Sequence, residues 1–76
     1  MSELTVEQLP LPERRYVAIR DAVRVTGKRL GVNYYDREVA VQCALNAWRA
    51  GASAAAAVER GRRYLVVLNG DRDGVA

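Results

Sequence analysis

Apolar side chains recur every three or four residues along most of this 76-residue chain, and glycine interrupts the pattern at positions 31 and 51. This spacing is typical of amphipathic helices, because residues three and four apart lie on one helix face. Glycine commonly follows the last residue of a helix. The pattern therefore predicts an all-α domain of three helices, the first over residues 13–30, the second from residue 33 or 36 to residue 50, and the third from residue 54 onward.

The segment Tyr64–Leu68, with the sequence YLVVL, fits two structures. Followed by Asn-Gly at 69–70, it suits a strand that enters a tight turn. The spacing of Val58, Gly61 and Leu65 instead continues a helix. We favour the helix because no other segment offers a strand for pairing, and we expect Gly61 to mark a kink or a close approach between helices.

Two prolines and the charge distribution predict the domain boundaries. Pro10 and Pro12 each favour an extended residue before them, so we expect residues 1–12 to form a flexible acidic arm. We expect residues 13–70 to form the three-helix domain and residues 71–76 a flexible tail. Three glutamates give residues 1–13 a net charge of −3, whereas seven basic and two acidic residues give residues 14–37 a net charge of +5.

The apolar positions also predict a core. Because the chain contains no Phe, we expect Tyr34 and Trp48 to fill its centre, while burial and exposure fit Tyr35 equally. Cys43 is flanked by alanines, and we expect it to be a small buried side chain. The second predicted helix is apolar on two sides, so we expect it to be the central one. The predicted core stripes are Tyr16, Ile19, Val23, Thr26 and Leu30 in the first helix, and Tyr34, Val41, Ala44, Leu45 and Trp48 with, roughly opposite, Val39, Cys43 and Ala47 in the second.

Composition argues against catalysis and metal binding. The chain has no His and a single Cys, so imidazole chemistry, an internal disulfide and a Cys-rich metal site are excluded. Its carboxylates show no paired spacing suited to acid–base work, and it has no Gly-rich phosphate loop. We expect no enzymatic activity, cofactor or small-molecule substrate. An acidic N-terminus without a long apolar run predicts a cytoplasmic protein that does not bind membranes.

Ala47, Gly51 and Ser53 stand in the order Ala-x-x-x-Gly-x-Ser at the joint between the second and third helices. This arrangement, over about residues 42–62, resembles the helix-turn-helix motif, which implies a third helix that enters the DNA major groove. The alternative is an ordinary helix end followed by an ordinary helix start. Alanines at 54–57 favour that alternative, because alanine contacts at most a thymine methyl group.

Basic residues supply the candidate binding surface. Arg20, Arg24 and Lys28 follow one another at four-residue intervals on one helix face. Such a stripe suits a phosphate backbone or an acidic protein groove, or it is a solvated surface. With the third helix included, the candidate binding residues for nucleic acid or a protein partner are Arg14, Arg20, Arg24, Lys28, Ser53, Arg60, Arg62 and Arg63.

Five consecutive apolar residues at 64–68 exceed what one helix face buries in so small a domain, so we expect some of them to meet another chain. The predicted interface residues are Tyr35, Tyr64, Leu65, Val67 and Leu68, and we expect a homodimer or another homo-oligomer. These features predict a non-enzymatic regulator that binds DNA in transcription. The alternative is a protein-binding modulator or inhibitor that docks on an acidic surface of a larger complex.

Overall fold

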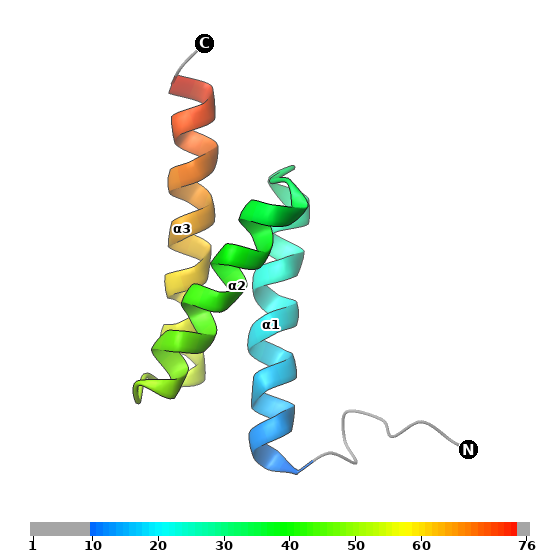
Figure 1. Cartoon of the computed structure of the whole chain (residues 1–76), viewed down its shortest axis with the longest axis vertical. Helices are drawn as coiled ribbons and strands as arrows, with labels where there is room; N and C mark the ends of the chain where they lie inside the picture. The colour runs from blue at the N-terminus through cyan, green and yellow to red at the C-terminus, as the bar shows by residue number, and fades with distance from the viewer. Residues whose placement is uncertain (1–9, 75–76) are drawn as a thin grey trace, which may run out of the picture.

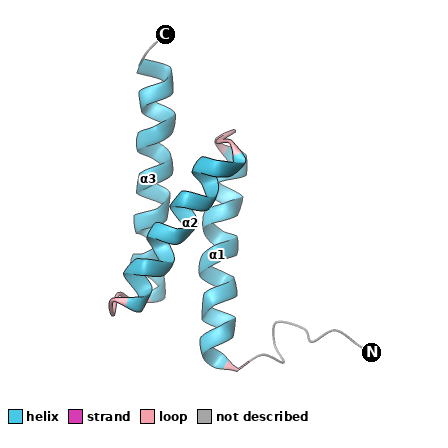
Figure 2. Cartoon of the chain, viewed as in Figure 1, coloured by secondary structure: helices cyan, strands magenta, loops and turns pink. Residues whose placement is uncertain are grey.

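The structure, a computed structural model, describes residues 10–74, although the side chains after Asn69 are not described. This part of the chain forms three α-helices and no strand (Figure 2). They are α1 (Leu11–Arg29), α2 (Tyr34–Arg49) and α3 (Ala54–Gly74). The all-α prediction is confirmed, and Tyr64–Leu68 is helical.

Both connections begin with a glycine in the left-handed region. Gly31 has a φ of 73° and Gly51 a φ of 109°. After α1, the Val32 N–H donates to the Gly27 carbonyl at 3.0 Å and the Gly31 N–H to the Lys28 carbonyl at 3.1 Å. This is a Schellman ending, and the same pair of bonds closes α2 from residues 51 and 52. Glycine ends both helices, as the sequence predicts.

Side-chain caps start the next two helices. Asn33 accepts a hydrogen bond from the Asp36 N–H at 2.8 Å, and Ser53 accepts one from the Ala56 N–H at 3.1 Å. Each cap satisfies a backbone donor that the first helical turn leaves without a partner. The short turns and caps together fix where α2 and α3 begin.

The helix limits differ from the predicted domain boundaries at both ends. Leu11 and Pro12, assigned to the arm, are already helical, because proline fits the first turn of a helix. α3 continues to Gly74, past the predicted limit at residue 70. Residues 1–9 of the predicted arm and residues 75–76 of the predicted tail lie outside the described part of the chain.

Each helix packs against the other two. α1 and α3 run in the same direction, and α2 crosses them diagonally on one side (Figure 1). The second half of α3 continues beyond the level at which α2 begins (Figure 1). α2 is therefore the central helix, as its two apolar stripes predict.

The core lies where α2 covers the other two helices. Gly61 of α3 is buried, and a Cβ atom there would lie 2.8 Å from Val23 Cγ2 and 3.1 Å from the carbonyl oxygen of Ala40. This confirms the predicted close helix approach at Gly61. The buried apolar residues are Ile19, Val23, Val32, Ala40, Val41, Ala44, Leu45, Ala57 and Leu65.

The prediction that Tyr34 fills the core is wrong, because 69% of its surface is exposed. Tyr34 is the first residue of α2, and its ring faces the Arg37 guanidinium at 5.5 Å instead of the core. Val32, in the turn before α2, is buried and joins the core cluster. Trp48 packs against that cluster but is only partly buried, so it lies at the edge of the core and not at its centre.

Candidate binding site

The predicted basic stripe on α1 is partly neutralised within the chain. The Arg24 guanidinium forms two hydrogen bonds with the Glu38 carboxylate, of 2.9 Å from Nε and 2.6 Å from Nη2. Arg20 Nε donates to Asp21 Oδ1 at 3.1 Å, and its guanidinium lies 6.0 Å from the centre of the Tyr16 ring. Releasing either arginine for a phosphate would break an existing ion pair, so the stripe is poorly prepared for that role.

The Arg24 pair makes the stability of the fold depend on pH. The hydrogen bonds from Arg24 hold the pKa of Glu38 below its ordinary value of 4.5, and the carboxylate raises the pKa of Arg24. Because folding lowers the carboxyl pKa, the stabilisation is complete above pH 4.5 and is lost as the pH falls through the folded-state pKa.

We expect Glu38→Gln to lower the free energy of unfolding at pH 7 by about 0.2–1 kcal/mol, since the pair is partly exposed to solvent. Below the folded-state pKa the variant and the parent should be equally stable. Urea unfolding at both pH values measures this, with the exposed Glu59→Gln as the matched control. An equal loss at both pH values would contradict a stabilising charge on Glu38.

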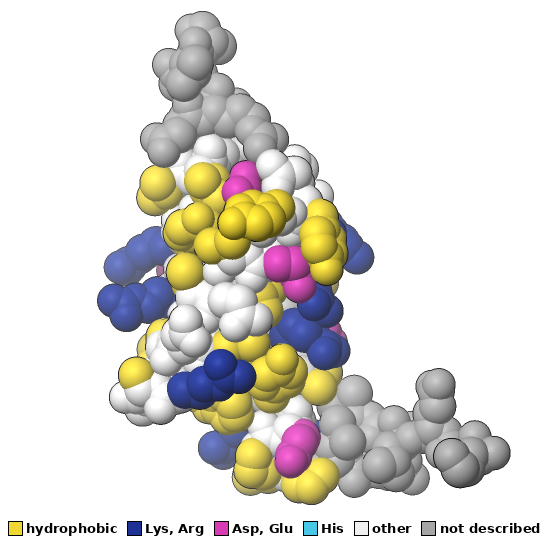
Figure 3. All heavy atoms as spheres, viewed as in Figure 1, with side chains coloured by type: hydrophobic (Ala, Val, Ile, Leu, Met, Phe, Trp, Pro, Cys, Tyr) yellow, Lys and Arg dark blue, Asp and Glu magenta, His cyan; other side chains and the backbone are white. Residues whose placement is uncertain are grey.

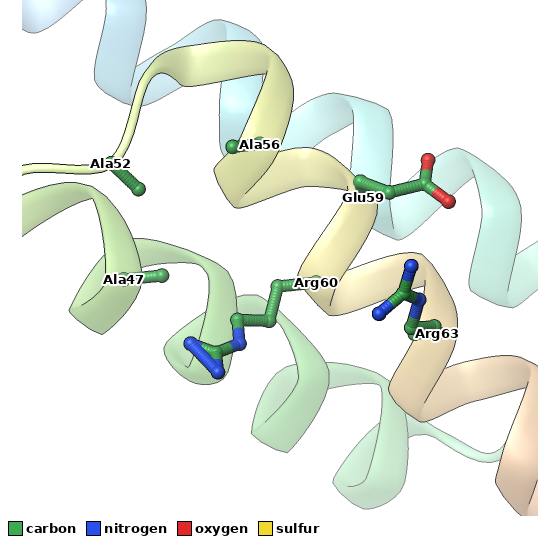
Figure 4. Close-up of a pocket in the computed structure, with 6 residues that line it drawn as sticks. All are labelled: Ala47, Ala52, Ala56, Glu59, Arg60 and Arg63. Atoms are coloured by element: carbon green, nitrogen blue, oxygen red, sulfur yellow. The ribbon is translucent and has the colours of Figure 1, made fainter.

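A groove lies between α2 and α3. Its first part is lined by small side chains of α2 and by two larger residues of α3, and the lining residues are Cys43, Asn46, Ala47, Ala50, Arg60 and Tyr64. Its second part lies beside the turn and is lined by Ala47, Ala52, Ala56, Glu59, Arg60 and Arg63 (Figure 4). Because both parts share Ala47 and Arg60, they form one continuous surface, the α2–α3 groove.

Short side chains create this groove. Ala47 and Ala56 face each other from the two helices without filling the space between them, and the Arg60 side chain extends toward α2 along the opening (Figure 4). Cys43 is only partly buried and lines the groove, so it is more exposed than the sequence predicts.

Two arginines give the groove its charge. Arg60 and Arg63 are exposed, and neither has a hydrogen-bond or ion-pair partner among the side chains that the structure describes. Arg62 is exposed as well, but its Nε donates to Thr26 Oγ1 at 3.1 Å, beside α1. Glu59 is the one carboxylate among the groove residues, so the groove carries a net positive charge.

The predicted interface residues differ in how far they are exposed to solvent. Leu65 is fully buried in the core of its own chain, so its assignment to a surface contact is wrong. Tyr35 and Val67 are exposed at 75% and 59%, and Tyr64 and Leu68 are partly buried. Apolar side chains gather over the start of α2 and the neighbouring part of α3 (Figure 3). This surface adjoins the α2–α3 groove at Tyr64.

The turn that resembles a helix-turn-helix is present, but the first turn of the helix that follows it lacks side chains that read bases. The Ser53 hydroxyl already caps α3, and the exposed residues of the first turn include Ala55 and Ala56. Arg14 and Lys28 are exposed on α1, away from the residues that line the groove. Among the predicted residues, the structure brings together Arg60, Arg63 and Tyr64 and leaves the α1 stripe apart.

Comparison with protein-family models, characterised proteins and solved structures gives no match. Within residues 10–74, no helix is both long and apolar enough to cross a bilayer. The same part of the chain has no cluster of three Cys, Asp or Glu side chains able to hold a metal ion.

Proposed function

We propose that this chain is a non-enzymatic binding module whose α2–α3 groove accepts an acidic, amphipathic segment of a partner protein. The observation that supports this is the pairing of an apolar floor with two arginines that lack partners among the described side chains. Apolar side chains of the partner would cover Cys43 and Ala47, while its carboxylates would pair with Arg60 and Arg63.

The spacing along α3 suits a helical or extended partner segment. Arg60, Arg63, Tyr64 and Val67 follow the i, i+3, i+4, i+7 pattern that places side chains on one helix face. Tyrosine and arginine are also the residues that contribute most to protein–protein binding. An exposed face of this composition matches the protein-binding alternative predicted from the sequence.

DNA binding is supported less well by the same geometry. The first turn of α3 offers alanine where a recognition helix needs polar side chains. Two of the three stripe residues on α1 are held by carboxylates of the chain. Transcriptional regulation, a cytoplasmic location and self-association stay predictions.

A designed helical peptide with a leucine stripe flanked by glutamates tests the proposal, with a lysine-flanked peptide as its counterpart. We expect only the acidic peptide to bind, and Arg60→Glu/Arg63→Glu to weaken it about tenfold, since each rim charge contributes up to about 1 kcal/mol. Fluorescence anisotropy at fixed salt measures both affinities. Sedimentation velocity of the same samples reports self-association.

The matched control is Arg15→Glu/Arg29→Glu, which changes the charge equally at exposed residues of α1 outside the groove. Equal weakening by both double variants would mean unspecific attraction and would contradict the groove. Random duplex DNA is the second ligand. Binding with a log–log salt slope of several units, lost in Arg20→Ala/Arg24→Ala/Lys28→Ala, would instead support the DNA-binding function.

A further inference from the structure

We infer that residues 1–9 of this chain occupy the α2–α3 groove when no partner protein is bound, and so regulate access to it. The inference rests on the proposed function, because the segment would compete for the same surface. Three observations support it: the composition of the segment, the place where it joins α1, and the charge of the groove.

The composition of residues 1–9 matches what the groove accepts. The segment MSELTVEQL contains two carboxylates, Glu3 and Glu7, no lysine or arginine, and apolar residues that include Leu4, Val6 and Leu9. It is therefore an acidic segment with apolar side chains, the same chemistry that the proposed partner would present. Glu3 and Glu7 have opposite charge to Arg60 and Arg63, which lack partners among the described side chains.

The segment joins the domain close to the groove. Pro10 precedes α1, and residues at the start of α1 share a hollow with Trp48 and Arg49 at the end of α2. Ala47 and Ala50, on the same stretch of α2, line the α2–α3 groove. In Figure 1 the start of α1, the end of α2 and the start of α3 lie toward the same end of the molecule.

The length of the segment is sufficient for this path. Nine extended residues span up to about 30 Å, whereas the path from the start of α1 to the groove crosses one helix, about 10–12 Å in diameter. Arg49 is exposed on that helix and adds a basic side chain along the path. By this comparison of lengths, a nine-residue segment is long enough to reach the α2–α3 groove without any change in the three-helix domain.

Attachment to the domain makes a weak contact effective. A short linker holds the segment at an effective concentration of about 1 mM. With an intrinsic dissociation constant of about 0.1 mM the segment would then fill most of the grooves, and with one of about 1 mM it would fill about half of them. A competing partner then binds about two- to tenfold more weakly than it would to an open groove. The segment would thus raise the partner concentration that is needed to fill the groove, without preventing partner binding.

A nitroxide on residue 2 of the full chain tests this directly. The label is attached to Ser2→Cys in a Cys43→Ala background, and amide signals are recorded from ¹⁵N-labelled protein. We expect the signals of residues 43–47 and 60–64 to weaken selectively, and the effect to disappear in the matched variant that also carries Glu3→Lys/Glu7→Lys. The same weakening in both proteins, or none in the groove, would overturn the inference.

Mixing distinguishes the chain's own segment from that of a second copy. When ¹⁵N-labelled chains without nitroxide are mixed with unlabelled chains that carry it, the groove signals should stay intact. The groove signals in the mixture could instead weaken as much as in the ¹⁵N-labelled chain that carries its own nitroxide. That result would place the segment of a second copy in the groove and would overturn the inference that the segment of the same chain occupies it.

The acidic peptide gives an independent readout. We expect Glu3→Lys/Glu7→Lys in the full chain to bind it about two- to tenfold more tightly than the parent, because the competing segment is repelled. Unchanged affinity together with unchanged groove signals overturns the inference and leaves the proposed function standing. Selective nitroxide effects without peptide binding overturn the proposed function and leave the groove assigned to residues 1–9.

Discussion

Leu65→Ala is expected to lower the free energy of unfolding by about 2–5 kcal/mol, because it removes a fully buried side chain and leaves a cavity. A chain of this length has a total stability of about 4–11 kcal/mol, so the loss is a large part of the whole. Urea unfolding, followed by circular dichroism, measures it. The parent and the variant should have equal unfolding slopes if the native fold is kept.

Val66→Ala is the matched control, since Val66 is the next residue on α3 and is 58% exposed. We expect its free energy of unfolding to change by at most about 0.5 kcal/mol, as for most surface substitutions. If Leu65→Ala instead left the stability of the monomer intact and reduced self-association, Leu65 would face a second chain, as the sequence predicts. Comparison of these neighbouring residues thus separates core from interface.

The two connections between the helices follow from local chemistry that the sequence displays directly. Gly31 and Gly51 adopt positive φ at the two helix ends, and Asn33 and Ser53 cap the next helices. These effects depend on residues within one turn of each other, so single-sequence reasoning captures them. The helical structure of Tyr64–Leu68 was predictable as well, from the lack of a pairing strand.

The partners of the charged residues were not predictable in the same way. Arg24 and Glu38 are 14 residues apart on different helices, and only the packing of α1 on α2 brings them together. The sequence of α1 alone therefore predicts a more basic surface than the folded domain presents, because Glu38 of α2 neutralises Arg24. The burial of Leu65 among exposed neighbours depends in the same manner on which face of α3 meets the other helices.

The sequence carries one signal of the groove, a concentration of small residues around the turn at Gly51. Small residues at 43, 47, 50, 52 and 56 line both sides of the joint between α2 and α3. Alanine also occurs in the core of this domain, where Ala57 is fully buried. An alanine fills the space between two helices where they lie close together and leaves a hollow where they lie further apart. The periodicity of the sequence does not give this distance.

Gly61→Ala is expected to lower the free energy of unfolding by about 1–2 kcal/mol. The added Cβ would lie 2.8 Å from Val23 Cγ2 and 3.1 Å from both the Ala40 carbonyl oxygen and Ala44 Cβ, so backbone of α2 would have to move. Overpacking of this kind costs about 1–3 kcal/mol, whereas the higher helix propensity of alanine returns up to about 1 kcal/mol. Urea unfolding of the two proteins gives the difference.

Gly27→Ala is the matched control, because the same Cβ at that position meets only a side chain. It would lie 2.7 Å from Arg37 Cγ and 2.9 Å from Cδ, so the Arg37 side chain, and no helix backbone, would have to move. That side chain is not held at its Nε, which is buried without a hydrogen-bond partner among the described residues. We expect Gly27→Ala to leave stability unchanged or to raise it by up to about 1 kcal/mol. Equal losses at both glycines would mean that α3 does not approach α1 and α2 at Gly61 as closely as the structure has it, since only that contact sets the two substitutions apart.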